Sequence, residues 1–206
     1  MSFSLNEVEA TTKKAARGAG YDWGLAEEAG KAARWLCAHG LDGVAHVAHL
    51  LTHGYADKLD QRRPQSLSSP WTGHSSLCPL ITGATLSDCA TCLPAEIGRI
   101  TAPVILLPFI ASAARQTDTA ITVEMDGFSA WTDGHALSLA GEPPAETARL
   151  VLKSGAAFEA LQPLQSRAHP APDAWITLDQ LAQRTYAPAT DESRRLGAGA
   201  GLSDND

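Results

Sequence analysis

The C-terminal tail is the first stretch whose residue types could do chemistry. The chain ends in GAGAGLSDND, and Gly197, Gly199 and Gly201 permit a positive φ and a close approach of the backbone. Successive N–H groups in such a stretch can form an anion-binding nest, to which Arg194 would add positive charge. Asp204 could instead bind a cation, and a frayed chain end is the third interpretation. The composition of the tail is that of a cradle for a small anion.

A second candidate site lies at the start and along the outer face of the second expected helix. Trp23, Glu27, Lys31 and Arg34 fall within a narrow arc at about 100° per residue. Tyr21 flanks the helix start, where free backbone N–H groups attract anions. Two aromatic rings, a carboxylate and a guanidinium would form a surface for a small ligand. The alternative is an ordinary i,i+4 ion pair between Glu27 and Lys31, with Trp23 covering the core.

Two groups of residues resemble metal ligands. His46, His49 and His53 share one face of the third expected helix, where three imidazoles could bind a transition metal. Cys89 and Cys92 form a single C-x-x-C, which is half of a structural zinc site. No second pair of ligands follows, so a solvated or interface face and free thiols are favoured, and no metal site is predicted. No nucleophile motif or cofactor fingerprint is present, and catalytic residues and cofactors stay unassigned.

The composition restricts the class of protein. The chain has 206 residues, 44% of them hydrophobic, and a formal net charge of −7. This charge and the lack of a Lys/Arg tract disfavour a nucleic-acid partner. The apolar run VILLPFIASAA is shorter than the roughly 20 residues that cross a bilayer, and the N-terminus lacks a signal-peptide pattern. We therefore expect a soluble cytoplasmic protein with no membrane partner and without a disulfide framework.

Three helices are expected to position these residues at the N-terminus. Ser4 and Glu7 form an S-x-x-E capping box at the start of the first helix. The second and third helices each begin at an aspartate that suits the N-cap and end at a glycine that suits the C′ position, over Asp22–Gly40 and Asp42–Gly54. The first two helices present many alanines inward, which predicts close packing between them.

The remainder of the chain changes from loop to strand to helix. Residues 59–76 are rich in Pro and Ser without a period, which predicts a connecting loop. A short helix is expected over Ala84–Cys92, and Thr177 is expected to cap a C-terminal helix that a short turn of helix over residues 191–196 follows. Two Asp-Gly turn signals separate the strand patterns. The expected strands are Val104–Ile110, Thr119–Met125, 128–131, 135–141 and Arg149–Lys153.

These elements predict an α+β fold. An N-terminal three-helix unit is packed with an antiparallel β-meander of four to five strands, and short helices follow at the C-terminal end. We expect a single domain over 1–206. It consists of a helical unit (1–58), a connecting loop (59–76), and a mainly β part with the C-terminal helices and the Gly-rich tail (77–206).

Two stretches carry a family resemblance. SLNEVEATTKKAARGAGYDWGLAEEAGKAARWL (Ser4–Leu36) and TYAPATDESRRLGAGAGLSDND (Thr185–Asp206) resemble a bacterial domain-of-unknown-function family of uncharacterised cytoplasmic proteins. The resemblance implies a cytoplasmic bacterial protein and a tail that is a motif of the family. It implies no activity, cofactor or catalytic residue.

Two functional hypotheses follow. The first is an enzyme or enzyme-like protein that binds a small anionic metabolite, with the tail folded back beside the start of the second helix and Arg34 or Arg194 holding the anion. The second is a non-catalytic subunit or interaction protein. In it the small-residue helices and the histidine face dock on a partner, either a second copy in a homo-oligomer or another protein in a hetero-complex.

Overall fold

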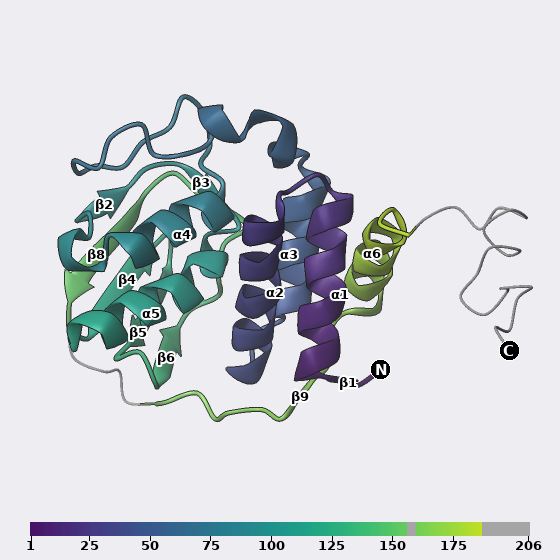
Figure 1. The fold of residues 1–206 in the computed structure, drawn as a ribbon. Coiled ribbons are helices and arrows are strands. Elements are labelled where there is room, and N and C mark those ends of the chain that lie inside the picture. The colour runs from purple at the N-terminus through teal and green to yellow at the C-terminus, as the bar shows by residue number, and fades with distance from the viewer. Residues whose placement is uncertain (156–159, 187–206) are drawn as a thin grey trace, which may run out of the picture.

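The fold consists of a helical bundle beside a β-sheet that a pair of helices covers (Figure 1). The structure is a computed structural model, and it describes residues 1–155 and 160–186. The predicted α+β class is confirmed. Among the residues described, no helix combines the length and the apolarity needed to cross a bilayer.

The helical bundle contains the three predicted N-terminal helices and one further helix. Each predicted helix begins as its sequence indicates, because Ser4, Asp22 and Asp42 each accept a hydrogen bond from a backbone N–H of the first turn. Ser4 and Glu7 form the full capping box, with distances of 3.1 and 2.7 Å. The bundle helices are α1 (Leu5–Gly18), α2 (Trp23–Ala38), α3 (Gly43–Thr52) and α6 (Pro172–Gln183).

Small residues bring α1 and α2 close together. Ala15 and Ala16 on α1 and Ala26, Ala29 and Ala33 on α2 are all buried. A Cβ on Gly30 of α2 would lie 2.7 Å from the carbonyl oxygen of Glu9, so the backbones approach as closely as the alanine pattern predicts.

The fourth bundle helix, α6, begins earlier than its sequence suggests. We expected Thr177 to be the N-cap, but the helix starts at Pro172, and the Thr177 hydroxyl donates to the Asp173 carbonyl at 2.8 Å within it. Proline is favoured in the first helical turn, which makes Pro172 the better start signal. α6 packs against α1 and α3. The further helix expected over 191–196 lies outside the described residues.

The main sheet has five antiparallel strands in the order β2-β8-β4-β5-β6. The predicted number of strands is right, but the sheet is not a simple meander, because β8 returns to pair with the free side of β4. The strands are β2 (Glu96–Ile97), β4 (Ile121–Met125), β5 (Phe128–Thr132), β6 (Leu137–Ala140) and β8 (Leu150–Ser154). Two short ladders join β1 (Phe3–Ser4) to β9 (Arg167–Ala168) and β3 (Ile100–Thr101) to β7 (Glu146–Thr147).

The strand predicted over Val104–Ile110 is wrong. These residues form a 3₁₀ helix, η3 (Pro103–Leu106), and the start of α5 (Leu107–Thr117). Pro103 and Pro108 each occupy the first turn of a helix, where a missing N–H costs nothing, whereas a central strand would lose a ladder hydrogen bond. A helix that is buried on most of its surface is apolar on all sides. Its sequence is therefore a continuous apolar run, which is also typical of a buried strand.

Two helices cover one face of the sheet (Figure 1). They are α5 and α4 (Pro79–Asp88), which pack against each other. The helix expected over Ala84–Cys92 is the second half of α4 followed by the 3₁₀ turn η2 (Ala90–Cys92). Phe109 of α5 lies directly over Gly83 of α4, where no Cβ would fit.

The segment between α3 and α4 is anchored in the core. It starts with the 3₁₀ helix η1 (Tyr55–Gln61), and the residues after it, which were expected to form a connecting loop, contain the fully buried Trp71. The Trp71 backbone N–H donates to the Glu96 carbonyl, and the Trp71 carbonyl accepts from Gly98, each at 2.9 Å. This segment therefore packs against the edge of the sheet.

Candidate functional site

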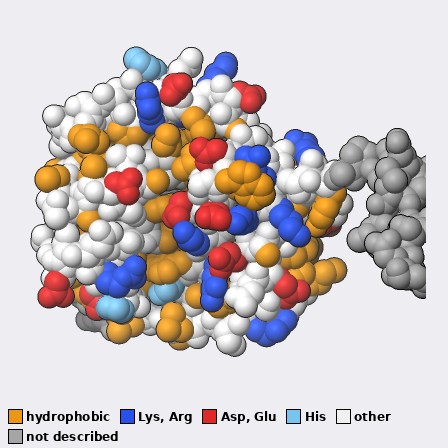
Figure 2. Space-filling model, in the orientation of Figure 1, with side chains coloured by type: hydrophobic (Ala, Val, Ile, Leu, Met, Phe, Trp, Pro, Cys, Tyr) orange, Lys and Arg blue, Asp and Glu red, His pale blue; other side chains and the backbone are white. Residues whose placement is uncertain are grey.

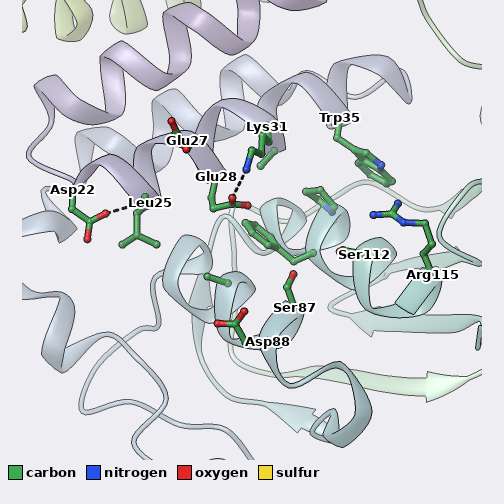
Figure 3. Close-up of a pocket in the computed structure, with 15 residues that line it drawn as sticks. Asp22, Leu25, Glu27, Glu28, Lys31, Trp35, Ser87, Asp88, Ser112 and Arg115 are labelled. Carbon is green, nitrogen blue, oxygen red and sulfur yellow. Dashed lines mark hydrogen bonds and ion pairs between the residues drawn. The ribbon is translucent and has the colours of Figure 1, made fainter. Parts of the chain in front are cut away.

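A groove of about 690 Å³ lies where the bundle meets the helix pair. α2 forms one wall, and α4 and α5 form the other (Figure 3). Figure 2 shows acidic and basic side chains gathered along this boundary, with hydrophobic side chains between them. The lining residues are Asp22, Gly24, Leu25, Glu27, Glu28, Lys31, Ala32, Trp35, Ala84, Ser87, Asp88, Pro108, Phe109, Ser112 and Arg115.

The groove is lined by both apolar and polar side chains. Its apolar side chains come from both walls, with Leu25, Ala32 and Trp35 on α2 and Pro108 and Phe109 on α5. Ligand sites in proteins are mostly apolar concavities with a few convergent polar groups. The groove combines such apolar side chains from both walls with eight polar or charged ones.

Most of the charges on the α2 wall are already neutralised. Glu28 accepts from Lys31 at 2.7 Å, and Glu27 accepts from Lys13 of α1 at 2.5 Å. The hydrogen bond and charge of Lys13 hold the pKa of Glu27 below its usual value, and the hydrogen bond to Glu28 raises the pKa of Lys31. Asp22 is occupied by its capping hydrogen bond to the Leu25 N–H at 2.8 Å. These groups stabilise α2 and have little capacity left for a ligand.

Arg115 and Trp35 are different, because their donors are unused. Among the described residues Arg115 forms no ion pair, and its one hydrogen bond is a long one of 3.4 Å to the Gly134 carbonyl. The Trp35 indole N–H has no hydrogen-bond partner there either, while its ring stacks on His39 with centroids 3.9 Å apart. Figure 3 places both side chains at the same end of the groove. Asp88, near the other end, is also unpaired in the described part of the chain.

The residues predicted around the start of α2 do not form one surface. Tyr21 is 1% exposed, and its hydroxyl lies 3.5 Å from the Cys78 sulfur, so it belongs to the core. Burial, together with the neighbouring thiol, raises the pKa of Tyr21. Trp23 is 64% exposed, and the Arg17 guanidinium lies 4.7 Å from the centroid of its ring.

Two of the predicted charged residues of α2, Glu27 and Arg34, pair with residues of α1. Glu27 pairs with Lys13, as described, and Arg34 pairs with Glu9 at 2.7 Å. The alternative pairing of Glu27 with Lys31 is wrong, since Lys31 pairs with Glu28. Of the predicted site residues, Glu27 lines the groove and Arg34 does not.

The structure does not describe the residues of the C-terminal tail that were predicted to bind a ligand. Arg194, Gly197, Gly199, Gly201 and Asp204 all lie outside the described residues. The cradle therefore stays a prediction.

The histidines lie on the surface side of α3, as predicted. His46 is half-buried, while His49 and His53 are exposed and adjacent, with ring centroids 4.5 Å apart. Cys37, Cys78, Cys89 and Cys92 are free, the first two buried. Within residues 1–155 and 160–186, no group of three or more His, Cys, Asp or Glu side chains has the arrangement to hold a metal ion.

His46 should make the stability of the protein depend on pH. Burial lowers the pKa of His46, so the unfolded chain binds a proton at pH values where the folded chain does not. Stability is then complete above the ordinary histidine pKa of about 6.5 and falls as the pH drops through that value to the lower, folded one. We expect urea unfolding of His46→Gln to lose less stability on acidification than that of the wild type. Equal pH profiles for His46→Gln and the wild type would contradict this role of His46.

A family model described as "Protein of unknown function (DUF3726)" matches residues 3–76. The matched part of the chain is similar to this domain-of-unknown-function family and includes Ser4–Leu36, the first of the two stretches that resembled such a family. The matched residues comprise α1, α2, α3 and the segment through Trp71 and so contribute one wall of the groove. No curated protein and no solved structure matches the chain.

No sequence pattern predicts the groove as a unit. Its two walls lie far apart in the sequence, since α2 ends at Ala38 and α4 begins at Pro79, and Arg115 and Trp35 belong to no short motif. Arg115 lies in the last turn of α5, and the interpretation of Val104–Ile110 as a strand conceals this helix in the sequence.

Proposed function

We propose that the protein binds a small organic anion in the groove between α2 and the α4–α5 pair. In this proposal Arg115 and the indole N–H of Trp35 hold the anionic group, and the apolar lining takes the body of the ligand. This retains the predicted class of ligand, a small anionic metabolite, and replaces Arg34 with Arg115 as its cation. The free cysteines suit a cytoplasmic setting for such a metabolite.

One observation carries the proposal. Of the two cations that line the groove, Lys31 is paired with Glu28, whereas Arg115 has no carboxylate partner in the described part of the chain. A guanidinium offers five donors in a planar fork that matches a carboxylate, and a charge-assisted pair is among the strongest polar contacts. An apolar lining beside it favours an organic ligand over an inorganic ion.

Titration calorimetry with simple probes tests this proposal. Benzoate, phenylacetate and hexanoate supply a carboxylate on an apolar body, and benzylamine is the cationic counterpart that would favour Asp88. We expect the carboxylates to bind and Arg115→Gln to weaken them by about tenfold or more, as the loss of a charged hydrogen bond predicts. Trp35→Phe removes the N–H while keeping an aromatic ring and should weaken them less. Arg34→Gln, whose guanidinium pairs outside the groove, is the matched control.

Two results would contradict the proposal. One is carboxylate binding that is unchanged in Arg115→Gln, and the other is preferential binding of benzylamine. The latter would assign the groove to cations through Asp88.

A second candidate is the interaction protein, for which the exposed side chains of the bundle are the observation. Trp23 is 64% and Ile176 is 51% exposed, and His49 and His53 are adjacent on α3. Light scattering of the purified chain tests this candidate. A stable homo-oligomer would support it, and a monomer that captures no partner would count against it.

A further inference from the structure

A second, more polar pocket lies between η1, the segment after it and the β3–β7 ladder. Its volume is about 620 Å³, and its lining is almost free of apolar side chains. The residues that matter are Tyr55, Arg62, Ser75, Ser76, Arg99 and Glu146. We infer that this pocket binds a tetrahedral oxyanion of the phosphate type, either as free phosphate or as the phosphate group of a small metabolite.

Arg62 is held in place before any ligand arrives. Its guanidinium stacks 3.7 Å from the centroid of the Tyr55 ring, and one of its nitrogens donates to the Ser76 carbonyl at 3.0 Å. The Tyr55 hydroxyl is fixed in turn by the Thr101 hydroxyl at 2.7 Å. Because only part of the guanidinium is used, donors remain for a ligand, and no carboxylate pairs with Arg62 in the described ranges. Such preorganisation lowers the entropy lost on binding.

A second guanidinium lines the same pocket. Arg99 pairs with Glu146 at 3.7 Å, and both side chains are exposed, so the pair is weak and can be exchanged for a stronger partner. Two guanidinium groups against one carboxylate leave the pocket with a formal charge of +1, in a chain whose net charge is −7. A local positive charge of this kind attracts small anions and concentrates them at the site.

The other polar groups favour an oxyanion with several acceptor oxygens. The hydroxyl of Ser76 shares a hydrogen bond of 3.0 Å with the Thr101 hydroxyl, and Ser75 lines the pocket with a hydroxyl that has no partner among the described residues. Phosphate presents more acceptor oxygens than a carboxylate and so can use both serines and both arginines. Because its lining contains no aliphatic side chain beyond that of Thr72, the pocket suits a small polar anion better than the apolar body of the ligand proposed for the groove.

Phosphorus NMR and calorimetry on the full chain test the inference. Inorganic phosphate and glycerol 3-phosphate are titrated at low salt, with benzoate as the non-tetrahedral anion. We expect both phosphates to bind in the range of about 0.1–10 mM and benzoate to leave this pocket empty. Equal affinities for the two phosphates would identify the phosphate group itself as the ligand, and tighter binding of the ester would identify a phosphorylated metabolite.

Three variants locate the binding. Arg62→Gln should weaken phosphate binding by about tenfold or more, because it removes charge-assisted donors. Arg99→Gln, at an exposed position that does not affect folding, should weaken it by a smaller factor of about threefold. Arg63→Gln is the matched control, because Arg63 adjoins Arg62 in sequence but pairs with Asp60 at 3.5 Å and does not line the pocket.

The inference fails if the wild type binds neither phosphate below about 10 mM, or if Arg62→Gln and Arg99→Gln both bind phosphate as the wild type does. It is independent of the groove, because Arg115→Gln should leave phosphate binding unchanged. A loss of phosphate binding in Arg115→Gln with normal binding in Arg62→Gln would move the oxyanion to the groove and overturn the assignment.

Discussion

Replacing Trp71 with alanine should lower the free energy of unfolding by about 3–5 kcal/mol, the usual cost of removing a large buried aromatic side chain. Trp71 is fully buried, although its segment has the composition of a loop. Its indole N–H donates to the Leu67 carbonyl at 3.1 Å, and its backbone is bonded to the edge of the sheet. The substitution therefore leaves a cavity and also removes the partner of a carbonyl.

Urea unfolding followed by circular dichroism measures this effect, and Trp23→Ala is the matched control. Trp23 is the same residue type with 64% of its surface exposed, and its cation–π contact with Arg17 contributes about 1 kcal/mol or less. We expect the Trp23 variant to lose far less stability than the Trp71 variant. Equal losses would show that the segment around Trp71 is not part of the cooperative core.

The helical bundle could be predicted from the sequence because its signals are local. The capping residues Ser4, Asp22 and Asp42 each determine where a helix begins, and the structure confirms all three. A cap depends on atoms within one turn of the chain, so distant residues have little power to override it. The Asp-Gly turn between β4 and β5 was predictable for the same reason, with Gly127 at a φ of 74°.

The secondary structure of the segment between α4 and β4 could not be predicted, because long-range packing determines whether it forms a helix or a strand. Val104–Ile110 is apolar at every position, and a pattern without polar residues cannot distinguish a buried helix from a buried strand. Pro103 and Pro108 are the better signal for a helix in this segment. Their place in the first turns of η3 and α5 agrees with the general preference of proline for that position.

For the candidate sites, too, local features could be predicted from the sequence and contacts between distant residues could not. Glu27 and Arg34 were correctly placed on an exposed face of α2, yet their partners lie on α1, which no spacing within α2 could show. Arg115 and Trp35 line one groove, and Arg62 and Arg99 line one pocket, only because segments distant in the sequence pack together. Both proposed sites are therefore products of tertiary structure, and a residue such as Arg62 stands in sequence beside Arg63 with nothing to distinguish the two.

The arginines of the two proposed sites can be compared with the other cations by the groups that each one contacts. Of the five arginines and lysines in α1 and α2, Lys13 and Arg34 are used in ion pairs between the two helices, and Lys31 is used in an ion pair within α2. Arg62 and Arg115 are instead held by neutral groups, a stacked ring and carbonyl oxygens. A guanidinium held by neutral partners keeps its full charge for a ligand, so these two residues are the first to test in a chain that is acidic overall.

Replacing Gly18 with alanine should be the most disruptive single change on the bundle surface where α1 meets α6. A Cβ at this position would overlap the Leu181 carbonyl of α6, and a backbone atom cannot rotate away as a flexible side chain can. Overpacking of this kind commonly costs about 1–3 kcal/mol, and a clash with backbone lies at the upper end or beyond. The helix α6 must therefore shift away from α1, which weakens its buried contacts through Leu178 and Leu181.

Gly24→Ala supplies the matched control for Gly18→Ala. Gly24 lies in α2, and the nearest atom to an added Cβ, the Asp22 carboxylate oxygen, is at an ordinary contact distance of 3.7 Å. Alanine favours a helix over glycine by up to about 1 kcal/mol, so this variant should be as stable as the wild type or slightly more so. Hydrogen exchange should show faster exchange of the α6 amides in Gly18→Ala alone. If Gly18→Ala matched Gly24→Ala in both stability and exchange, α6 would not be seated on α1 as the structure has it.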